Sequence, residues 1–358
     1  MTAALWPTLI YAFVLLAHLI VPARWVDGYV RDRTTGRKLR YRLNGLRVLT
    51  LTVAVWVAVC VSGLFPWNAF YIHRWEMAAG ACALGFVFTL AIVLPAPAQP
   101  GKSFFEDLYL GRWDNPQFGG GRLDAKMVLY LVGAVMLELN VLSFAAHHLE
   151  LHPEDPSPGV FLYAAMFSFF VCEYLNFEQV HLYTYDFMAE RVGFKLGWGC
   201  LVFYPFFYPV GLWATAEAPN PHTPTALLAF YCAVFFSGWA LARGANLQKY
   251  QFKLDPDAKA FGILDPRKLT DGKRNVLTGG FWGLSRHINY LGEILMASGL
   301  ALVLGNPLAI GPWLYPLYYV ALLVPRQLDD DRRCAERYGH LWTQYCERVP
   351  WRIIPFVY

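Results

Sequence analysis

Long apolar runs constrain this chain more than any other sequence feature. A helix that crosses a bilayer needs about 20 mostly apolar residues. Hydropathy places nine such runs, at 5–23, 48–66, 76–95, 127–146, 159–181, 193–214, 224–242, 289–304 and 307–325. The run 159–181 carries carboxylates and the stretch 289–325 allows a hairpin, so a tenth span or a re-entrant piece stays open. We predict an all-α, polytopic integral membrane protein with nine to ten transmembrane helices.

The basic residues provide an independent test of this map. Of the 30 Lys and Arg residues, 29 fall in alternate connections, at 24–47, 96–126, 183–195, 243–288 and 326–358. The opposite connections contain only Arg74. Cytoplasmic loops of membrane proteins carry such an excess of positive charge. The pattern therefore predicts an N-terminus outside and a C-terminus in the cytoplasm, in a bacterial inner membrane or the endoplasmic reticulum.

Charge and cysteine usage exclude several other classes of protein. The net charge of +4 follows from topology and does not indicate a nucleic-acid partner. Basic residues beside the spans are expected to contact membrane lipids. The seven cysteines show no CxxC or other ligand spacing, so we expect no metal and no disulfide.

The connections contain little predicted structure of their own. The Gly- and Pro-rich loop 96–126 is expected to pack without regular structure. The tail 326–348 has helical spacing, with one face formed by Cys334, Arg337, Tyr338, Leu341, Trp342 and Tyr345, and Pro350 ends it. We expect this cytoplasmic helix and the apolar ending WRIIPFVY to dock on the membrane domain.

Ionisable residues inside spans are costly and indicate function by default. In 159–181, Glu173, Asn176 and Val180 share one helical face, and Tyr174, Glu178, His181 and Tyr185 share the next. These groups suit an acid or a substrate site. A self-satisfied packing network, or a helix end that meets water, is the alternative. Glu138 and Asn140 form a weaker pair in 127–146.

A second polar cluster lies on the predicted cytoplasmic side. It combines Lys249 and Lys253, then Arg286, His287, Asn289 and Tyr290, then Asp329, Asp330 and Asp331 with Arg332, Arg333 and Arg337. Arg binds phosphate in a bidentate manner, and Gly279, Gly280 and Gly283 permit close approach of the backbone. Ordinary positive-inside anchors and aromatic-belt residues would produce the same composition.

Several ordered motifs resemble one family. GGFWGLSRHINYLGE (279–293) resembles the sterol reductase pattern SGWWGxxRHxNYxGD, and the ending DDRRCAERYGHLWTQYCERVPWRIIPFVY resembles DExxCxxKYGxxWxxYCxxVPYRIxPxxY. RYRLNGL, DNPQFGGGRLDAK, LNVLSF, FVCEYLNFEQVHLYTYD, VGFKLGWGCLVFYPFFY and LQKYQFKLDP are similar to further family elements. The family comprises C14, C7 and C24(28) sterol reductases and the membrane domain of the lamin B receptor. RHINYLGE and the ending look closest to the C14 branch.

The resemblance implies one membrane domain over 1–358, with the sterol pocket and scaffold mainly in 1–240 and an NADPH-binding half in 241–358. It assigns the cofactor to Lys249, Lys253, Leu277, Trp282, Arg286, His287, Asn289, Tyr290, Asp330, Cys334, Arg337, Tyr338 and Tyr345. The sterol would contact Glu173, Asn176, Glu178 and His181. Departures from the family pattern occur at Phe170, Glu173, Cys200, Lys253, Phe281 and Glu293.

The implied reaction is reduction of a sterol carbon–carbon double bond, most closely C14=C15. An isolated alkene accepts hydride poorly, so protonation precedes hydride transfer from NADPH. Asp330 and Glu173 are the expected proton relay; because Phe170 replaces a family Tyr, Tyr174 or Tyr208 is expected to substitute. Reduction at C7 or C24(28) stays open. A membrane methyltransferase of the isoprenylcysteine type shares a looser pattern, and a non-catalytic scaffold or a sterol sensor is a further alternative.

Overall fold

The computed structural model describes residues 2–32 and 35–358, which form two compact units that meet in sequence at Asn220 and Pro221. Six of the described helices are long and apolar enough to cross a membrane: Ala3–Ile20, Arg74–Val93, Ala125–Leu151, Pro158–Asn176, Phe194–Thr215 and Thr225–Leu254. Gly45–Val61 and Ile288–Val303 are apolar but shorter. A mostly helical, multi-pass membrane architecture is confirmed, and nine to ten spans stay a prediction.

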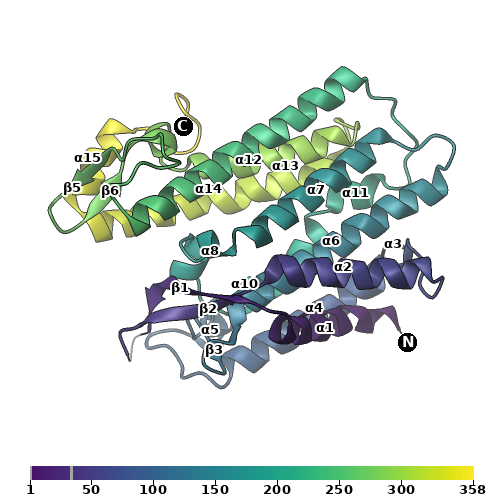
Figure 1. Ribbon diagram of the computed structural model, residues 1–358, viewed down its shortest axis with the longest axis horizontal. Helices are drawn as coiled ribbons and strands as arrows, with labels where there is room; N and C mark the ends of the chain where they lie inside the picture. The colour runs from purple at the N-terminus through teal and green to yellow at the C-terminus, as the bar shows by residue number, and fades with distance from the viewer. Residues whose placement is uncertain (1, 33–34) are drawn as a thin grey trace. The chain divides into compact units, whose positions relative to one another are not determined.

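The first unit surrounds one buried helix, α6 (Ala125–Leu151). The elements that pack against it are α1 (Trp6–Ile20), α2 (Gly45–Val61), α3 (Ala69–Ile72), α7 (Pro158–Asn176), the π-helix η2 (Gly199–Phe207) and α11 (Val210–Thr215) (Figure 1). Helix α4 (Arg74–Val93) packs on α1, on η2 and on the short helix η1 (Ala3–Leu5). Gly133 allows the close contact with η2, because a Cβ there would lie 2.4 Å from the carbonyl oxygen of Cys200. Side chains buried on every face of α6 explain its nearly continuous apolar sequence.

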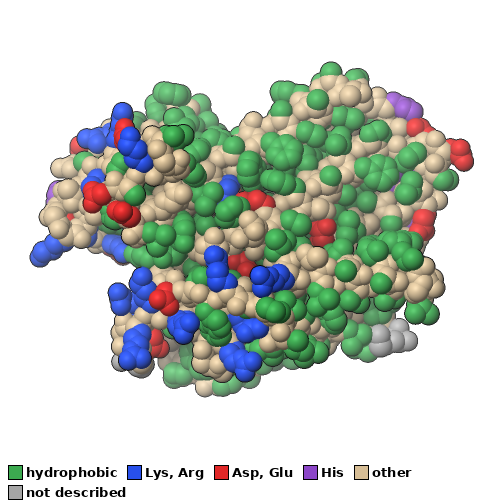
Figure 2. All heavy atoms as spheres, viewed as in Figure 1, with side chains coloured by type: hydrophobic (Ala, Val, Ile, Leu, Met, Phe, Trp, Pro, Cys, Tyr) green, Lys and Arg blue, Asp and Glu red, His purple; other side chains and the backbone are tan. Residues whose placement is uncertain are grey.

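Short elements cover one end of this unit. Strands β1 (Arg24–Arg31) and β2 (Lys38–Leu43) pair antiparallel, and β3 (Gln117–Phe118) pairs with β4 (Leu123–Asp124). Helices α5 (Phe104–Leu110), α8 (Glu178–His181), α9 (Tyr185–Met188) and α10 (Phe194–Trp198) complete it. Figure 2 shows basic side chains gathered over the β1–β2 hairpin and hydrophobic side chains over the neighbouring helices.

The second unit is a helical layer with a small cap. Helices α12 (Thr225–Leu254), α13 (Ile288–Val303) and α14 (Ile310–Tyr338) lie side by side (Figure 1). Gly238 and Gly292 bring α12 and α13 together, since a Cβ on Gly292 would lie 2.5 Å from the carbonyl oxygen of Gly238. The cap consists of β5 (Lys268–Thr270), β6 (Asn275–Leu277), the 3₁₀ turn η3 (Gly280–Gly283) and α15 (His340–Arg348).

Three local predictions were wrong. The expected helix 159–181 ends at Asn176, and α8 begins after Phe177, so the two predicted polar faces do not continue along one axis. The tail helix belongs to α14 and breaks at Gly339, whose positive φ of 55° ends the helix before α15. The loop 96–126 contains α5, because Ser103 and Glu106 form a capping box.

Candidate functional site

The cluster in the second unit begins where a glycine-rich turn is fixed on α12. Gly280 has a φ of 62°, a conformation that glycine adopts without strain. Gln248 of α12 is buried and fixes the turn from both sides: its amide nitrogen donates to the carbonyl of Gly279 (3.1 Å), and its oxygen accepts from the backbone nitrogen of Phe281 (3.0 Å). The side chain of Gln248 therefore fixes the backbone of the turn that precedes α13.

Trp282 is held in this turn by contacts with two helices. Its indole nitrogen donates to the carbonyl of Ala245 on α12 (2.9 Å), and its own carbonyl accepts from the hydroxyl of Tyr345 on α15 (2.7 Å). The ammonium of Lys249 lies 5.4 Å from the centre of the indole ring. A fixed ring beside a cation is suited to a ligand that has both a flat ring and negative charge.

A second aromatic and cationic group follows along α12 and α14. The ammonium of Lys253 donates to the hydroxyl of Tyr338 (3.1 Å), and the guanidinium of Arg337 lies 5.5 Å from the same ring. Cys334 lies one helical turn before Tyr338. Burial, and next the charge of Asp330, raise the pKa of the Cys334 thiol to about 12, so this cysteine is a neutral thiol at physiological pH.

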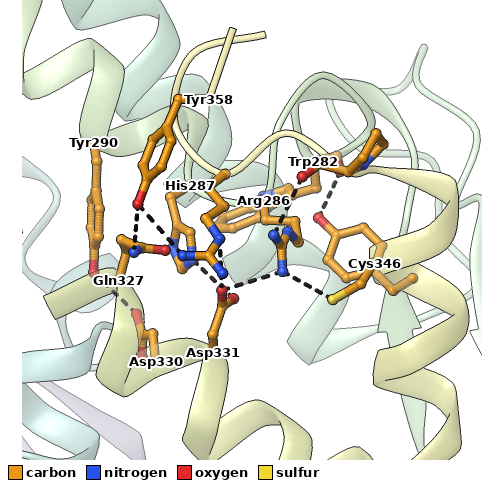
Figure 3. Close-up of polar contacts among 12 residues, drawn as sticks. Trp282, Arg286, His287, Tyr290, Gln327, Asp330, Asp331, Cys346 and Tyr358 are labelled. Carbon is orange, nitrogen blue, oxygen red and sulfur yellow. Dashed lines mark hydrogen bonds and ion pairs between the residues drawn. The ribbon is translucent and has the colours of Figure 1, made fainter. Parts of the chain in front are cut away.

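Tyr290, at the start of α13, forms a polar pair with Asp330 of α14. The hydroxyl of Tyr290 donates to Oδ2 of Asp330 (3.0 Å), and the Tyr290 ring stacks on His287 with 5.1 Å between ring centres (Figure 3). Beside them, the amide of Asn289 donates to Asn246 at 3.5 Å, while its buried oxygen has no hydrogen-bond partner among residues 2–32 and 35–358. The Asn289 oxygen is therefore available to a ligand, and the hydrogen bond between Tyr290 and Asp330 is suited to proton transfer.

Asp331 is the centre of a buried charge network behind this pair. Its carboxylate lies 3.2 Å from the guanidinium of Arg286, 3.3 Å from the imidazole of His287 and 3.8 Å from Arg352 (Figure 3). Burial raises the pKa of this carboxyl, but the hydrogen bond from His287 and the adjacent positive charges outweigh burial, so the pKa lies below its ordinary value. Asp331 therefore stays ionised and balances the positive groups around it.

The final segment of the chain is attached to the same network. The backbone nitrogens of Arg286 and His287 donate to the carbonyls of Trp351 and Arg352 at 2.9 and 2.7 Å, and Ser285 donates to Ile353 (2.8 Å). The Arg286 guanidinium also contacts the thiol of Cys346 (2.9 Å). Phosphate binding by Arg286 stays a prediction. The residue is only 7% exposed, and its guanidinium already contacts Asp331 and Cys346.

The first unit brings some of the other predicted residues together. A pocket is lined by Met127, Tyr130, Leu131, Tyr174, Leu175, Glu178, His181 and Phe187. Within it the rings of Tyr174 and His181 stack, with centres 3.7 Å apart, and His181 donates to the carbonyl of Tyr174 (3.1 Å). Glu178 accepts from the backbone nitrogen of Gly45 at 3.0 Å, where α2 begins. Glu178 thus has a structural role at a helix N-terminus.

The remaining predicted residues lie outside this pocket lining. Glu173 is a buried residue of α7, Asn176 is the exposed last residue of that helix, and Tyr208 follows η2. The carbonyl of Tyr208 accepts a hydrogen bond from Tyr163 (3.4 Å). Phe170 and Cys200 are packed in the same unit, and the Phe170 ring lies 6.3 Å from that of Tyr174.

Comparison with known proteins identifies the chain. The family model described as the Ergosterol biosynthesis ERG4/ERG24 family matches residues 2–358. The chain belongs to this family. A protein named Delta(14)-sterol reductase from Arabidopsis thaliana is 31% identical, across 98% of this chain and 95% of its own length. Delta(14)-sterol reductase TM7SF2 of Mus musculus is 34% identical (96% and 82%), and a Delta(14)-sterol reductase of Methylotuvimicrobium alcaliphilum is 32% identical (90% and 76%).

The second unit of this ERG4/ERG24 family member has side chains that fit a dinucleotide phosphate. Lys249, Lys253 and Arg337 supply positive charge, and the rings of Trp282 and Tyr338 lie beside those charges. The buried oxygen of Asn289, which has no hydrogen-bond partner in the part of the chain that the structure describes, is an acceptor that a ligand amide would satisfy. Leu277 is a buried residue of β6, in the cap beside them.

Two residues organise this site: sequence reasoning missed Gln248 and did not single out Asp331. Gln248 holds the glycine turn, and the carboxylate of Asp331 contacts Arg286, His287 and Arg352. Asp331 was visible as one of three consecutive acids, but the triplet alone does not distinguish its members. The Asp329 carboxylate instead pairs with Arg332 and Arg333. Three consecutive residues of α14 therefore have different partners: Asp329 pairs at the surface, Asp330 contacts Tyr290, and Asp331 belongs to the buried network.

Proposed function

We propose that this protein reduces the C14=C15 double bond of a sterol with NADPH. The observation that supports the proposal is similarity over nearly the whole chain to three relatives that are each named Delta(14)-sterol reductase. The positive charges and ring faces of the second unit are the expected recognition elements for NADPH. The distribution of basic residues favours a cytoplasmic position for this unit.

NADPH supplies hydride to the sterol when it is bound. In our proposal Lys249, Lys253 and Arg337 bind its phosphates, since cationic side chains form the strongest hydrogen bonds to phosphate oxygens. Trp282 and Tyr338 provide ring faces for its flat groups. The amide of Asn289 orients the nicotinamide, because its oxygen otherwise stays buried without a partner among the described residues.

NADPH delivers hydride to one alkene carbon, and the chain itself must supply the proton that is added to the other. The hydrogen bond from Tyr290 to Asp330 is a suitable source, because a phenol and a carboxyl 3.0 Å apart can pass one proton between them. His287, stacked on Tyr290 and held by Asp331, keeps the ring in position. In the first unit, Glu173 stays the second candidate acid, with Tyr174 and Tyr208 as candidate intermediates.

A sterol panel tests the reaction. Purified protein is incubated with NADPH and one sterol at a time, with a double bond at C14, C7 or C24(28). Mass spectrometry follows the products. We expect a gain of two hydrogens for the C14 substrate alone. Reduction of another sterol would move the assignment within the family. Binding of S-adenosylmethionine but not NADPH would favour a methyltransferase and contradict the proposal.

Replacement of Tyr290 by Phe tests the proton source. We expect kcat to fall about 100-fold, the order expected for loss of a general acid or base. NADPH affinity should change little, because the ring and its stacking on His287 remain. Glu173→Gln is the parallel variant in the first unit. Normal turnover in either variant would exclude that residue from proton supply.

A further inference from the structure

A buried carboxyl inside the first unit has no part in the function proposed so far. Glu138 lies in the middle of α6 and is 5% exposed. One of its oxygens, Oε1, accepts a hydrogen bond of 2.6 Å from the hydroxyl of Ser168 on α7. Its other oxygen, Oε2, is buried and has no hydrogen-bond partner among the described residues.

This open oxygen contrasts with the polar side chains next to it on α6. Asn140 donates to the carbonyl of Pro205 (2.8 Å), within the π-helix. Ser143 donates to the carbonyl of Trp67 (2.7 Å) and accepts from the backbone nitrogen of Phe70 (3.1 Å). An unsatisfied polar group inside a membrane protein is costly. A carboxyl oxygen that has no partner among the described residues is therefore available to accept a hydrogen bond from a bound group with a hydroxyl or amine.

The position of Glu138 relates it to the pocket of the same unit. Leu131 lines that pocket and precedes Glu138 by seven residues, two helical turns or about 10 Å along α6. On the antiparallel helix α7, Leu175 lines the pocket and follows Ser168 by seven residues. Cys172, one turn beyond Ser168, is exposed. The pair Glu138–Ser168 thus lies on the faces of α6 and α7 that lead to the pocket, beside an accessible position.

We propose that Glu138, oriented by Ser168, binds the ring-A hydroxyl of the sterol substrate. This inference rests on the proposed function for the identity of the ligand. The hydroxyl donates to Oε2, which completes the hydrogen bonding of the carboxyl, while Ser168 keeps Oε1 occupied. A sterol is otherwise hydrocarbon, so its hydroxyl is the one group that a polar site can recognise. Ring A lies at the far end of the ring system from C14, which agrees with a hydroxyl site two helical turns from the pocket.

The test compares a 3-hydroxy sterol with its 3-deoxy analogue, both with the C14 double bond, on the full-length protein in detergent. Binding is measured with radiolabelled sterol and turnover with NADPH. We expect the wild type to bind the hydroxy sterol about 10- to 100-fold more tightly, the usual range for giving a buried polar group its hydrogen-bond partner. Glu138→Leu should weaken binding of the hydroxy sterol by the same factor and leave binding of the deoxy analogue unchanged.

Asn140→Leu is the matched control, two residues along the same helix and with its hydrogen bond made to the protein. We expect it to lower Tm and to retain the preference for the hydroxyl. Equal binding of the two sterols by the wild type would overturn the inference and requires no variant to fold. Loss of preference in Asn140→Leu, or equal weakening of both sterols by Glu138→Leu, would overturn it as well. A hydroxyl preference without any NADPH-dependent turnover would instead contradict the proposed reaction and leave this site intact.

Discussion

The two units handle polar groups in different ways. In the second unit the network around Asp331 pairs charge with charge, with one carboxylate facing Arg286, His287 and Arg352. In the first unit the buried polar side chains mostly meet backbone carbonyls. The ammonium of Lys126 is fully buried and donates to the carbonyls of Asp186 (2.9 Å), Phe187 (3.3 Å) and Glu190 (2.7 Å).

This difference follows from what each unit has to do. Backbone carbonyls satisfy a donor without introducing another charge, which suits the interior of an apolar helical bundle. Paired charges hold several segments in fixed positions at once, which suits a site that must bind an anionic ligand. Oε2 of Glu138 is one of several buried polar atoms of the first unit that have no hydrogen-bond partner among the described residues, and it belongs to a carboxyl in the middle of α6. The variants below test whether the two arrangements are as different as their geometry indicates.

The largest effect is expected from Asp331→Asn. The substitution leaves the guanidinium of Arg286, a residue that is 7% exposed, without its balancing negative charge, and it removes the carboxylate partner of His287, which is 5% exposed. Removal of one partner from a buried ion pair costs about 3 to 5 kcal/mol. We expect a lower Tm together with weaker NADPH binding, measured by thermal unfolding and calorimetry in detergent.

Asp329→Asn is the control for that variant, because Asp329 lies on the same helix and pairs with Arg332 and Arg333, which are about half or more exposed. It should cost less than about 1 kcal/mol, as surface pairs do. Asp331→Glu should recover part of the NADPH affinity. Equal effects of the Asp329 and Asp331 variants on Tm and NADPH affinity would show that the buried network contributes no more than a surface ion pair.

Lys126→Met tests the backbone-satisfied arrangement of the first unit. Methionine fills a similar volume but leaves three carbonyls without their donor, and each buried unsatisfied group costs about 1 to 3 kcal/mol. We expect destabilisation of about 3 kcal/mol with unchanged NADPH binding, measured in the same two assays. Lys102→Met is the control, since Lys102 makes only a partly exposed pair with Glu106 at 3.9 Å. A lower NADPH affinity in Lys126→Met would show that the units are not energetically separable.

Glu178→Gln should have a smaller effect. Its carboxyl accepts from the backbone of Gly45 at the N-terminus of α2, where a full negative charge contributes about 1 kcal/mol. Burial raises the pKa of Glu178 to about 7, so only part of that charge is present at neutral pH. The amide oxygen of Gln retains the hydrogen bond and loses only the charge. Thermal unfolding should therefore show a small decrease in Tm. The exposed Glu154→Gln is the control, and a larger loss of sterol binding than of stability would instead assign Glu178 to the substrate.

The smallest effect concerns acid stability. The pKa of Asp331 is lowered on folding, so this group stabilises the protein above the unfolded value of about 4 and loses that contribution as pH falls through the folded value. The difference in Tm between wild type and Asp331→Asn should therefore decrease below about pH 4. A difference that stays constant down to pH 3 would contradict ionisation of Asp331 in the folded protein.

Much of the helical pattern could be predicted, because it depends on local composition. Six of the nine apolar runs that hydropathy placed are long apolar helices in the described structure, and the polar cluster at 286–290 was visible as a dense run of donors and acceptors. Helix ends were harder to predict. The break after Asn176 and the one at Gly339 depend on backbone conformation at single residues, which apolar periodicity does not report.

The sequence alone determined the family, the membrane class and the residue types available for chemistry, since motifs, apolar runs and charge are properties of neighbouring positions. Only the tertiary structure decided which polar groups meet. Asp331 lies 45 positions from Arg286 and pairs with it, while Asp329, two positions earlier, pairs with its own helix. Ser168 donates to one oxygen of Glu138, and the other oxygen has no partner within residues 2–32 and 35–358. Such choices depend on how distant helices pack, and hydrogen bonds act over only a few ångströms.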